Sequence, residues 1–302
     1  MTEVDAGGLL PNGIPAGRIA VSGADGQLGA EVCRQLGSAA VPLIWPEFEL
    51  TDHAAVRARL SDLQPRVLIH CAAYTQVDRA ESEPAVCRAV NTLAVENLVA
   101  SCRELDCVLV QLSTDYVFGA DVQRRTPYRE GDPTGPLSVY GSSKWEAEQR
   151  VRAWEKHFIV RTCGLYTRAA GGPIRGRNFV DTLRVLGPER GQLRVVHDQV
   201  CTPSYVPHVA RAIRFLIGTQ AFGTYHVVNG GQTSWYDFAG EIFRLAGQSV
   251  RLEPIRSDQY AAAAARPKYS VLSTAKYDAL GGPQLPDWQA ALAEYFADTD
   301  AG

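Results

Sequence analysis

A glycine-rich turn between a short strand and a helix is the feature that most constrains this chain. Residues 18–22 form a β-branched run, and Gly23, Gly26 and Gly29 precede an apolar stretch that ends at Leu36. The first glycine permits a tight turn, the second lets the backbone approach a pyrophosphate, and the third permits close helix–strand packing. Many turns need glycine, so the position directly after the first strand is what predicts a dinucleotide-binding site.

The first half of the chain alternates strands with helices. We expect strands over 41–45, 67–71 and 107–112, and helices over 52–63 and 83–105. Such alternation indicates a parallel sheet with right-handed crossovers, and the apolar strands indicate helices on both of its faces. The predicted fold class is α/β, with a Rossmann-type doubly wound parallel sheet and a smaller α/β substrate-binding domain.

The pattern loosens after residue 160. Helices are expected over 178–186, 206–217 and 235–246, strands over 193–196 and 223–228, and a helix or linker over the alanines 261–265. The predicted domains are a disordered leader (1–17), a dinucleotide-binding domain (18–162 and 205–228) and a substrate-binding domain (163–204 and 229–302).

Charge and cysteine usage exclude several classes. The 302 residues carry 30 basic and 33 acidic side chains, and a charge of −3 argues against a nucleic-acid binder. No signal peptide and no apolar run of about 18 residues is present, so we expect no membrane span. The 7 cysteines include no Cys-x-x-Cys pair, which excludes a zinc ribbon and a redox dithiol. Scattered thiols are typical of a reducing cytosol, so we expect a cytoplasmic protein.

Two glutamates bear on the choice of cofactor. Glu47 and Glu49 lie about 20 residues beyond the loop, where a carboxylate bonds the adenosine ribose 2′-hydroxyl. A carboxylate there repels a 2′-phosphate, which favours NADH slightly over NADPH. Pro46 disturbs the local geometry, and a solvated surface group is the alternative interpretation of either glutamate. The expected cofactor is therefore NADPH or NADH.

A tyrosine and a lysine four residues apart form the candidate catalytic pair. Tyr140 and Lys144 fall on one face of a predicted helix. A nearby ammonium lowers the pKa of a tyrosine, and the lysine can bind the nicotinamide ribose. Thr114 follows the fourth strand at the carboxyl edge of the sheet, where its hydroxyl can bond a substrate carbonyl. An exposed helix pair is the alternative, which the glycine loop and Thr114 make the weaker interpretation.

The sequence resembles the dTDP-4-dehydrorhamnose reductase family of extended short-chain dehydrogenase/reductases, from about residue 18 to residue 296. The Gly-x-x-Gly-x-x-Gly spacing is that of the extended reductases. The segments that carry the resemblance are 23–29, 71–84, 113–118, 139–144, 160–162, 198–199, 202–203, 235–237, 265–267 and 285–289.

The resemblance implies an activity and its residues. NAD(P)H would deliver hydride to C4 of a dTDP-4-keto-6-deoxyhexose, foremost dTDP-4-dehydro-L-rhamnose, and Tyr140 would protonate the alkoxide. Lys144 would tune Tyr140, Thr114 and Asp115 would contact the sugar, and Arg266 would meet the nucleotide diphosphate or form a surface salt bridge. The implied cofactor contacts are Gly23, Gly26, Gln27, Leu28, Gly29, Glu49, Leu50, Ala73, Tyr74, Thr75, Leu112, Tyr140 and Lys144.

Two departures from the family matter. Gly164 stands where the family often has a tryptophan near the sugar, which predicts an enlarged or reshaped sugar pocket. The basic loop 168–177 could compensate by meeting the diphosphate, or be a solvated loop. Some members bind Mg²⁺ at a dimer interface; Glu31 and Glu294 match two ligands, but Pro207 stands at a third. We therefore expect no metal site, and a homodimer stays open.

Three other functions compete with the rhamnose reductase. A related dTDP-4-ketosugar of another deoxysugar pathway could be the substrate. A dehydratase or an epimerase on the same fold is another alternative, but sugar-nucleotide dehydratases need an Asp-Glu pair after the Ser-Thr, and here Asp115 is followed by Tyr116. The β subunit of methionine adenosyltransferase resembles this family and binds a dinucleotide without that reductase role. The retained Thr114, Tyr140 and Lys144 favour an enzyme.

Overall fold

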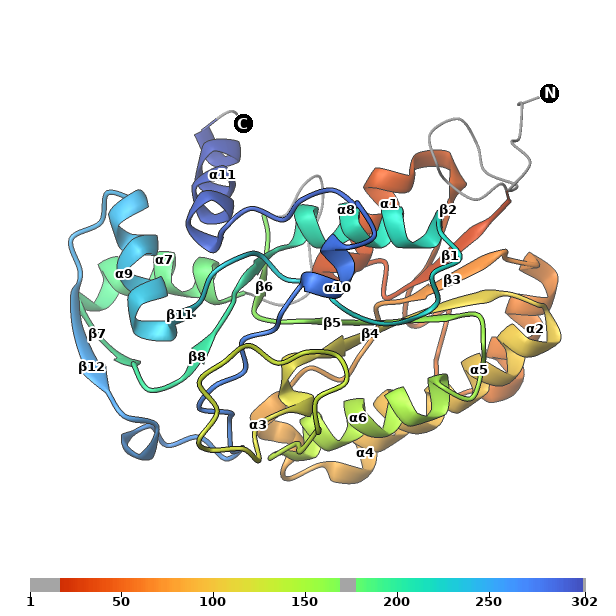
Figure 1. Cartoon of the computed structure of the whole chain (residues 1–302), viewed down its shortest axis with the longest axis horizontal. Coiled ribbons are helices and arrows are strands. Elements are labelled where there is room, and N and C mark those ends of the chain that lie inside the picture. Colours follow the sequence, from red (N-terminus) through yellow and green to blue (C-terminus); the bar gives the residue numbers. More distant parts are fainter. Residues whose placement is uncertain (1–16, 169–177, 301–302) are drawn as a thin grey trace.

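A six-stranded parallel sheet forms the centre of the molecule (Figure 1). The computed structural model describes residues 17–168 and 178–300. The sheet order is β10-β5-β4-β3-β1-β2. Its strands are β1 (Ile19–Ser22), β2 (Ala40–Leu43), β3 (Val67–His70), β4 (Val108–Thr114), β5 (His157–Thr162) and β10 (Gly223–His226). Every residue of β1 and β3 is buried, as expected of strands covered on both faces.

Helices cover both faces of this sheet, which confirms the doubly wound fold (Figure 1). On one face lie α1 (Gln27–Leu36) and α8 (Val206–Ile217), whose apolar residues share a core with β1 and β5. On the other lie α2 (His53–Leu63), α5 (Ala94–Glu104) and α6 (Val139–Val151). The bounds of α8 coincide with the predicted helix.

Local chemistry explains where these helices begin. Asp52 caps α2 by accepting a hydrogen bond from the Ala55 N–H at 3.0 Å, and Ser138 caps α6 by accepting from the Gly141 N–H at 3.1 Å. Pro84 opens the short helix α4 (Pro84–Arg88), a position where its missing N–H costs nothing.

Three predicted elements of this half were wrong in extent. The helix expected over 83–105 is interrupted by a π-helical turn at Ala89–Leu93 between α4 and α5. The second strand ends at Leu43 instead of residue 45, and the fourth continues to Thr114. The longer fourth strand carries Thr114 directly to the sheet edge.

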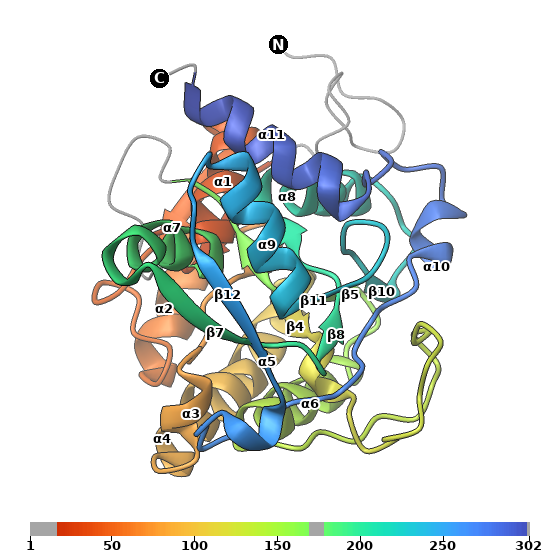
Figure 2. The same ribbon diagram turned by 90° about the vertical axis from the view of Figure 1, so that its left-hand side faces the viewer.

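The smaller part of the molecule is built around aromatic side chains. Its helices are α7 (Phe179–Arg190), α9 (Trp235–Leu245) and α11 (Trp288–Asp300), with short helices α3 (Val77–Ala80) and α10 (Ala275–Asp278) elsewhere. Its strand pairs are β12 (Arg251–Ile255) with β7 (Gln192–Val196), β11 (Thr233–Ser234) with β8 (Val200–Cys201), and β6 (Leu165–Tyr166) with β9 (Ser204–Tyr205). The helices α7 and α9 and the strands β7 and β12 face the viewer in Figure 2. Residues 261–265 form no helix.

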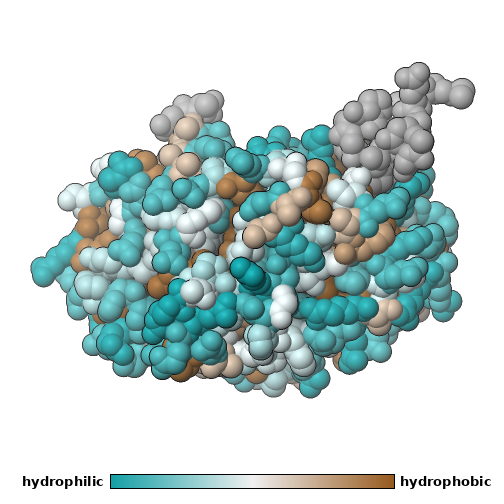
Figure 3. Space-filling view, viewed as in Figure 1, coloured by the Kyte–Doolittle hydropathy of each residue, from teal (hydrophilic) through white to brown (hydrophobic). Residues whose placement is uncertain are grey.

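The two-domain division stays a prediction, although the strands of the large sheet all lie within 18–162 and 205–228. The predicted leader lies outside the described residues apart from Gly17. Of the basic loop only Arg168 is described, and it donates to the Asp298 carbonyl. No helix in the described ranges is long and apolar enough to cross a membrane. The face in Figure 3 is mostly hydrophilic, with only scattered apolar residues.

Candidate active site

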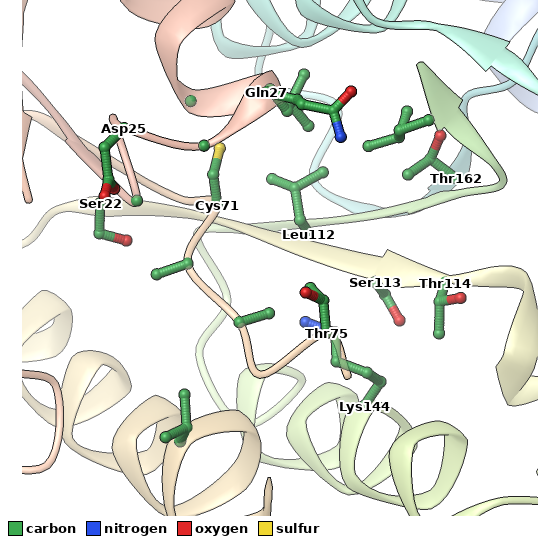
Figure 4. A pocket seen from close by; sticks show the side chains of 18 of the residues that line it. Ser22, Asp25, Gln27, Cys71, Thr75, Leu112, Ser113, Thr114, Lys144 and Thr162 are labelled. Atoms are coloured by element: carbon green, nitrogen blue, oxygen red, sulfur yellow. The ribbon is translucent and has the colours of Figure 1, made fainter. Parts of the chain in front are cut away.

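A cavity of about 740 Å³ opens at the carboxyl ends of β1, β3 and β4, beside the start of α1 (Figure 4). Most of the predicted site residues line it: Gly23, Gly26, Gln27, Leu28, Gly29, Glu49, Leu50, Ala73, Thr75, Leu112, Thr114, Tyr140, Lys144 and Gly164. Ligands in open α/β sheets bind at this edge. The structure thus brings together residues that are up to about 140 positions apart in the sequence.

The glycine loop has the geometry of a diphosphate cradle. Gly23 has a φ of +67°, and a Cβ on it would lie 2.6 Å from the Ala72 nitrogen. A Cβ on Gly29 would lie 2.1 Å from the Gly23 carbonyl oxygen, so α1 packs directly onto the loop. Gly26 is the N-cap of α1 and supplies no capping side chain. The first N–H groups of α1 therefore remain for an anionic ligand, and the loop fits a dinucleotide.

Burial favours the protonated form of Tyr140, the candidate acid. Tyr140 and Lys144 lie one turn apart on α6 and both line the cavity with Thr114. Burial raises the pKa of Tyr140, the charge of Asp115 raises it further, and a hydrogen bond with Thr114 acts in the opposite direction. Burial outweighs the opposing contributions to this pKa, and the expected lowering by Lys144 stays a prediction. A protonated phenol is the form that an acid needs.

Lys144 is poised near neutrality. Burial lowers its pKa to about 8, while the charge of Glu148, one turn further along α6, acts in the opposite direction. The Tyr116 ring stands edge-on to Tyr140, with centroids 6.1 Å apart and an interplanar angle of 80°. The Tyr116 ring therefore packs against one side of Tyr140.

Asp115 lies behind the cavity and is not among the residues that line it. Its carboxylate accepts hydrogen bonds from the Ser270 hydroxyl at 2.6 Å and the Thr114 hydroxyl at 3.1 Å. Burial raises its pKa to about 6. Its contacts orient the Thr114 hydroxyl, whose oxygen also accepts from the Tyr116 N–H at 3.2 Å.

A buried ion pair supports this edge of the sheet and was missed in the sequence. Arg161 donates to both oxygens of Glu148, at 2.8 and 2.7 Å, and both side chains are fully buried. Ser113 donates to the same carboxylate at 2.6 Å. The bonds join β4, β5 and α6 under Thr114 and Lys144. The sequence did contain one indication that Glu148 belongs to this region, because it follows Lys144 by one helical turn and lies on the same face of the helix.

Comparison with known proteins identifies the family. The model of the RmlD substrate binding domain matches residues 17–301. A dTDP-4-dehydrorhamnose reductase of Streptomyces griseus is 41% identical over 293 residues, covering 93% of this chain and 94% of the relative. The chain belongs to this family. The predicted family and the predicted fold are both confirmed.

Two further relatives are a reductase named for a different ketosugar and a reductase with a bound cofactor. A probable dTDP-4,6-dihydroxy-2-methyloxan-3-one 4-ketoreductase of Streptomyces antibioticus is 37% identical and covers 92% of this chain and 94% of its own length. The crystal structure of a Bacillus anthracis dTDP-4-dehydrorhamnose reductase in complex with NADP matches with a TM-score of 0.88 at 37% identity, covering 93% of this chain and 99% of that one.

Gly164, the position of the family's frequent tryptophan, lies in a crowded place. Its φ is +51°, and a Cβ there would lie 3.1 Å from the Trp235 ring and 3.2 Å from the Pro203 Cα. The Trp235 ring therefore lies against Gly164, and the expected enlargement or reshaping of the sugar pocket stays a prediction. An aromatic side chain from α9 stands close to where the family often has one on the loop after β5.

Besides Asp115, two further predicted contacts, Tyr74 and Arg266, lie outside the cavity lining. The Tyr74 hydroxyl donates to Glu83 at 2.9 Å. Arg266 donates to both oxygens of Asp78, at 2.8 and 3.1 Å. These placements show what each group binds within the protein, and their roles toward cofactor or substrate stay predictions.

The family's implied Mg²⁺ ligands are engaged with other side chains. Glu31 accepts two bonds from Arg34, and Glu294 accepts from His208 Nε2 at 2.8 Å. Gln35 bridges Glu31 and the Pro207 carbonyl at 2.7 and 2.9 Å. Within the described residues, no group of three His, Cys, Asp or Glu side chains could hold a metal ion. The expected absence of a metal site stays a prediction, and so does the homodimer.

Proposed function

We propose that this protein reduces the C4 ketone of a dTDP-4-keto-6-deoxyhexose, converting dTDP-4-dehydro-L-rhamnose into dTDP-L-rhamnose with NADPH or NADH. What carries the proposal is the meeting of Tyr140, Lys144 and Thr114 in one cavity with the glycine loop. Membership of the reductase family supports it. The seven cysteines are free thiols, and we place the reaction in the reducing cytoplasm.

Tyr140, Lys144 and Thr114 each have a separate role in the proposed reaction. The reduced dinucleotide, when bound, supplies the hydride that adds to C4. Tyr140 donates its hydroxyl proton to the C4 oxygen, because the alkoxide that forms there is a stronger base than the phenolate left on Tyr140. Burial keeps the pKa of Tyr140 high, so the phenol still carries this proton before hydride transfer. Lys144 stabilises the resulting phenolate through its ammonium charge. Thr114 positions the ketone oxygen beside Tyr140.

A related dTDP-4-ketosugar is the second candidate substrate. The Streptomyces antibioticus relative is 37% identical and is a probable 4-ketoreductase of a different ketosugar. The altered surroundings of Gly164 and Trp235 lie on the sugar side of the site. Each ketosugar is offered to the protein separately. The two values of kcat/KM show which ketosugar is preferred, and NMR identifies each product.

Tyr140→Phe tests the proposal. We expect kcat for dTDP-4-dehydro-L-rhamnose to fall by about 10²- to 10⁴-fold, the usual contribution of a positioned acid. Dinucleotide binding should persist. Tyr116→Phe is the matched control, since it removes a hydroxyl from the neighbouring ring and should leave kcat within severalfold. The absorbance of the reduced nicotinamide follows turnover.

One result with the wild-type protein would exclude the proposed reductase. If the wild-type protein binds a dinucleotide tightly but oxidises it with neither dTDP-4-ketosugar, the reductase is excluded. The regulatory-subunit alternative would then be favoured.

A further inference from the structure

One residue that lines the cavity belongs to α7 and was not predicted from the sequence as a site residue. Asn178 is buried and is the N-cap of this helix. The apolar side chains of α7 pack in the aromatic core of the smaller part, whereas those of α1 pack under the large sheet. Asn178 therefore lies where the two parts of the molecule meet at the cavity.

The two ends of the Asn178 amide have different partners. Its Oδ1 accepts from the Asp181 N–H at 2.9 Å, which is the bond of a helix cap and which identifies this end as the oxygen. Its Nδ2 donates to Gln27 Oε1 at 3.1 Å, to the Thr167 carbonyl at 2.8 Å and to the Asp181 carboxylate at 2.7 Å. One side chain thus joins the start of α1, the segment after β6 and the start of α7.

Thr167 connects this amide to the sugar side of the site. It comes directly after β6, whose first residue, Leu165, lines the cavity next to Gly164. Gly164 is the position that we expect near the sugar. Thr167 is buried, and a buried carbonyl that loses its donor costs free energy. The bond from Asn178 therefore holds the sugar-side segment in place.

Gln27 connects the amide to the dinucleotide side of the site. It is the first residue of α1 and follows Gly26, the N-cap without a capping side chain. Its Oε1 accepts from Asn178, and none of the described residues accepts from its Nε2. Figure 4 shows the Gln27 side chain in the cavity, with its nitrogen on the side of Leu112. Gln27 Nε2 can therefore donate to a phosphate oxygen at the start of α1.

The hydrogen count of the Asn178 amide restricts how these elements can be arranged. Its Nδ2 has two hydrogens and three acceptors, so all three bonds form only when α1, α7 and the segment after β6 are correctly placed together. A ligand that binds at Gln27 and a ligand that binds beside Gly164 both favour that one arrangement. Each ligand should then raise the affinity for the other, because binding linkage is reciprocal.

We propose that Asn178 is a positioning residue that couples the two ligands: through its bond to Gln27, a bound dinucleotide raises the affinity for the dTDP-sugar, and a bound dTDP-sugar raises the affinity for the dinucleotide. The inference rests on the proposed function, which supplies the two ligands. It goes beyond that function, because hydride transfer and protonation by Tyr140 involve neither side-chain amide.

Isothermal titration calorimetry of the full-length protein tests the coupling. The probes are the reduced dinucleotide, NADH or NADPH, whichever binds more tightly, and dTDP-L-rhamnose. The latter carries an alcohol at C4 and accepts no hydride, so no turnover disturbs the titration. We expect saturating dTDP-L-rhamnose to lower the Kd of the dinucleotide by about fivefold, the lower end of the usual coupling between two sites.

Two variants remove the bridge from opposite sides. Asn178→Ser removes the amide donor but keeps an oxygen that can cap α7. Gln27→Met keeps the length of the side chain and the backbone N–H groups of α1, but has no amide. Each should reduce the coupling from about fivefold to none, and the double variant should lose no more than either single variant. Thr182→Val is the matched control, because the Thr182 hydroxyl bonds only the backbone of Asn178, at 2.7 Å, and the side-chain bridge stays intact.

The outcomes separate this inference from the proposed function. A dinucleotide Kd that dTDP-L-rhamnose does not change would overturn the inference, while turnover that depends on Tyr140 would leave the reductase intact. An equal loss of coupling in Asn178→Ser and Thr182→Val would also overturn it, since it would indicate a general weakening of α7. Failure of the wild-type protein to bind dTDP-L-rhamnose would overturn the inference, and, if neither ketosugar is reduced, the proposed function as well.

Discussion

The large sheet and the smaller C-terminal part bury different kinds of group beside the same cavity. Under the sheet edge lie ionisable side chains: the Glu148–Arg161 pair, Asp115 and Lys144, all buried. The smaller part instead packs aromatic rings against one another, with Tyr166 and Tyr205 centroids 5.6 Å apart. Both regions reach the cavity, the first through Thr114 and the second around Gly164.

This difference indicates a division of roles. Buried charges fix protonation states and hydrogen-bond directions, because each must be paired where the dielectric is low. Aromatic packing instead fixes shape through large contact areas. Substitutions under the sheet should therefore change stability and its pH dependence, whereas substitutions near Gly164 should change sugar binding.

The largest expected effect comes from breaking the buried ion pair. Arg161→Met leaves Glu148 buried without its bidentate partner, which costs about 3–5 kcal/mol of unfolding free energy. Denaturant unfolding followed by circular dichroism measures this loss.

Arg152→Met is its matched control. Arg152 contacts the same carboxylate at 2.9 Å, but its side chain is 35% exposed. Because the Arg152 end of this pair reaches solvent and Glu148 keeps Arg161, we expect a smaller loss, about 0–1 kcal/mol. Equal destabilisation by the two variants would show that burial of the pair is not what matters, and would remove one side of the comparison.

The second expected effect is a pH-dependent gain in stability from Asp115→Asn. Asp115 has a pKa of about 6 in the folded protein against 3.8 when unperturbed, so the folded state retains a proton that the unfolded state has lost. Stability therefore falls as pH rises from about 4 to about 6, and the full cost is present above that range. An asparagine in place of the acid has no such cost, so the variant should be more stable at pH 8 by up to about 3 kcal/mol.

Melting temperatures of both proteins across pH 4 to pH 8 check this prediction. The two curves should converge at the acidic end and separate through the middle of the range. A constant difference at every pH would mean that the introduced amide changes packing and that ionisation of Asp115 contributes nothing. Ser270→Ala, which removes the 2.6 Å donor, should raise the midpoint of the separation further.

The same contrast explains how much the sequence could predict. The glycine loop, the strand–helix alternation and the bounds of α8 follow from local patterns, because turn residues and apolar periodicity act within a few positions. Tyr140, Lys144 and Thr114 could be placed for the same reason, since helix spacing and the sheet edge are local properties.

Long-range contacts set the features that the sequence did not show. The π-helical turn carries Asn91, whose side chain bonds both the N–H and the carbonyl of Tyr74. The strand β12 is largely exposed and contains Pro254, so it has little apolar pattern to read. Trp235 and Gly164 are far apart in the chain, and only folding brings the ring against the glycine.

The smallest of the expected effects tests the aromatic side of the comparison. Trp235 lies on α9, against Gly164 and against Phe179, whose ring centroid is 4.8 Å away. Trp235→Ala should open the space beside Gly164 and raise KM for the dTDP-sugar by about tenfold, or about 1.4 kcal/mol, while NADH affinity and kcat change little. The glycine loop and Tyr140 lie on other elements and keep their geometry.

Tyr236→Ala, which removes the next ring on the same helix, should leave KM near the wild-type value. A parallel loss of sugar and dinucleotide affinity in Trp235→Ala would show that this ring supports the whole cavity, and the division between a chemical sheet edge and a shape-giving aromatic part would no longer hold.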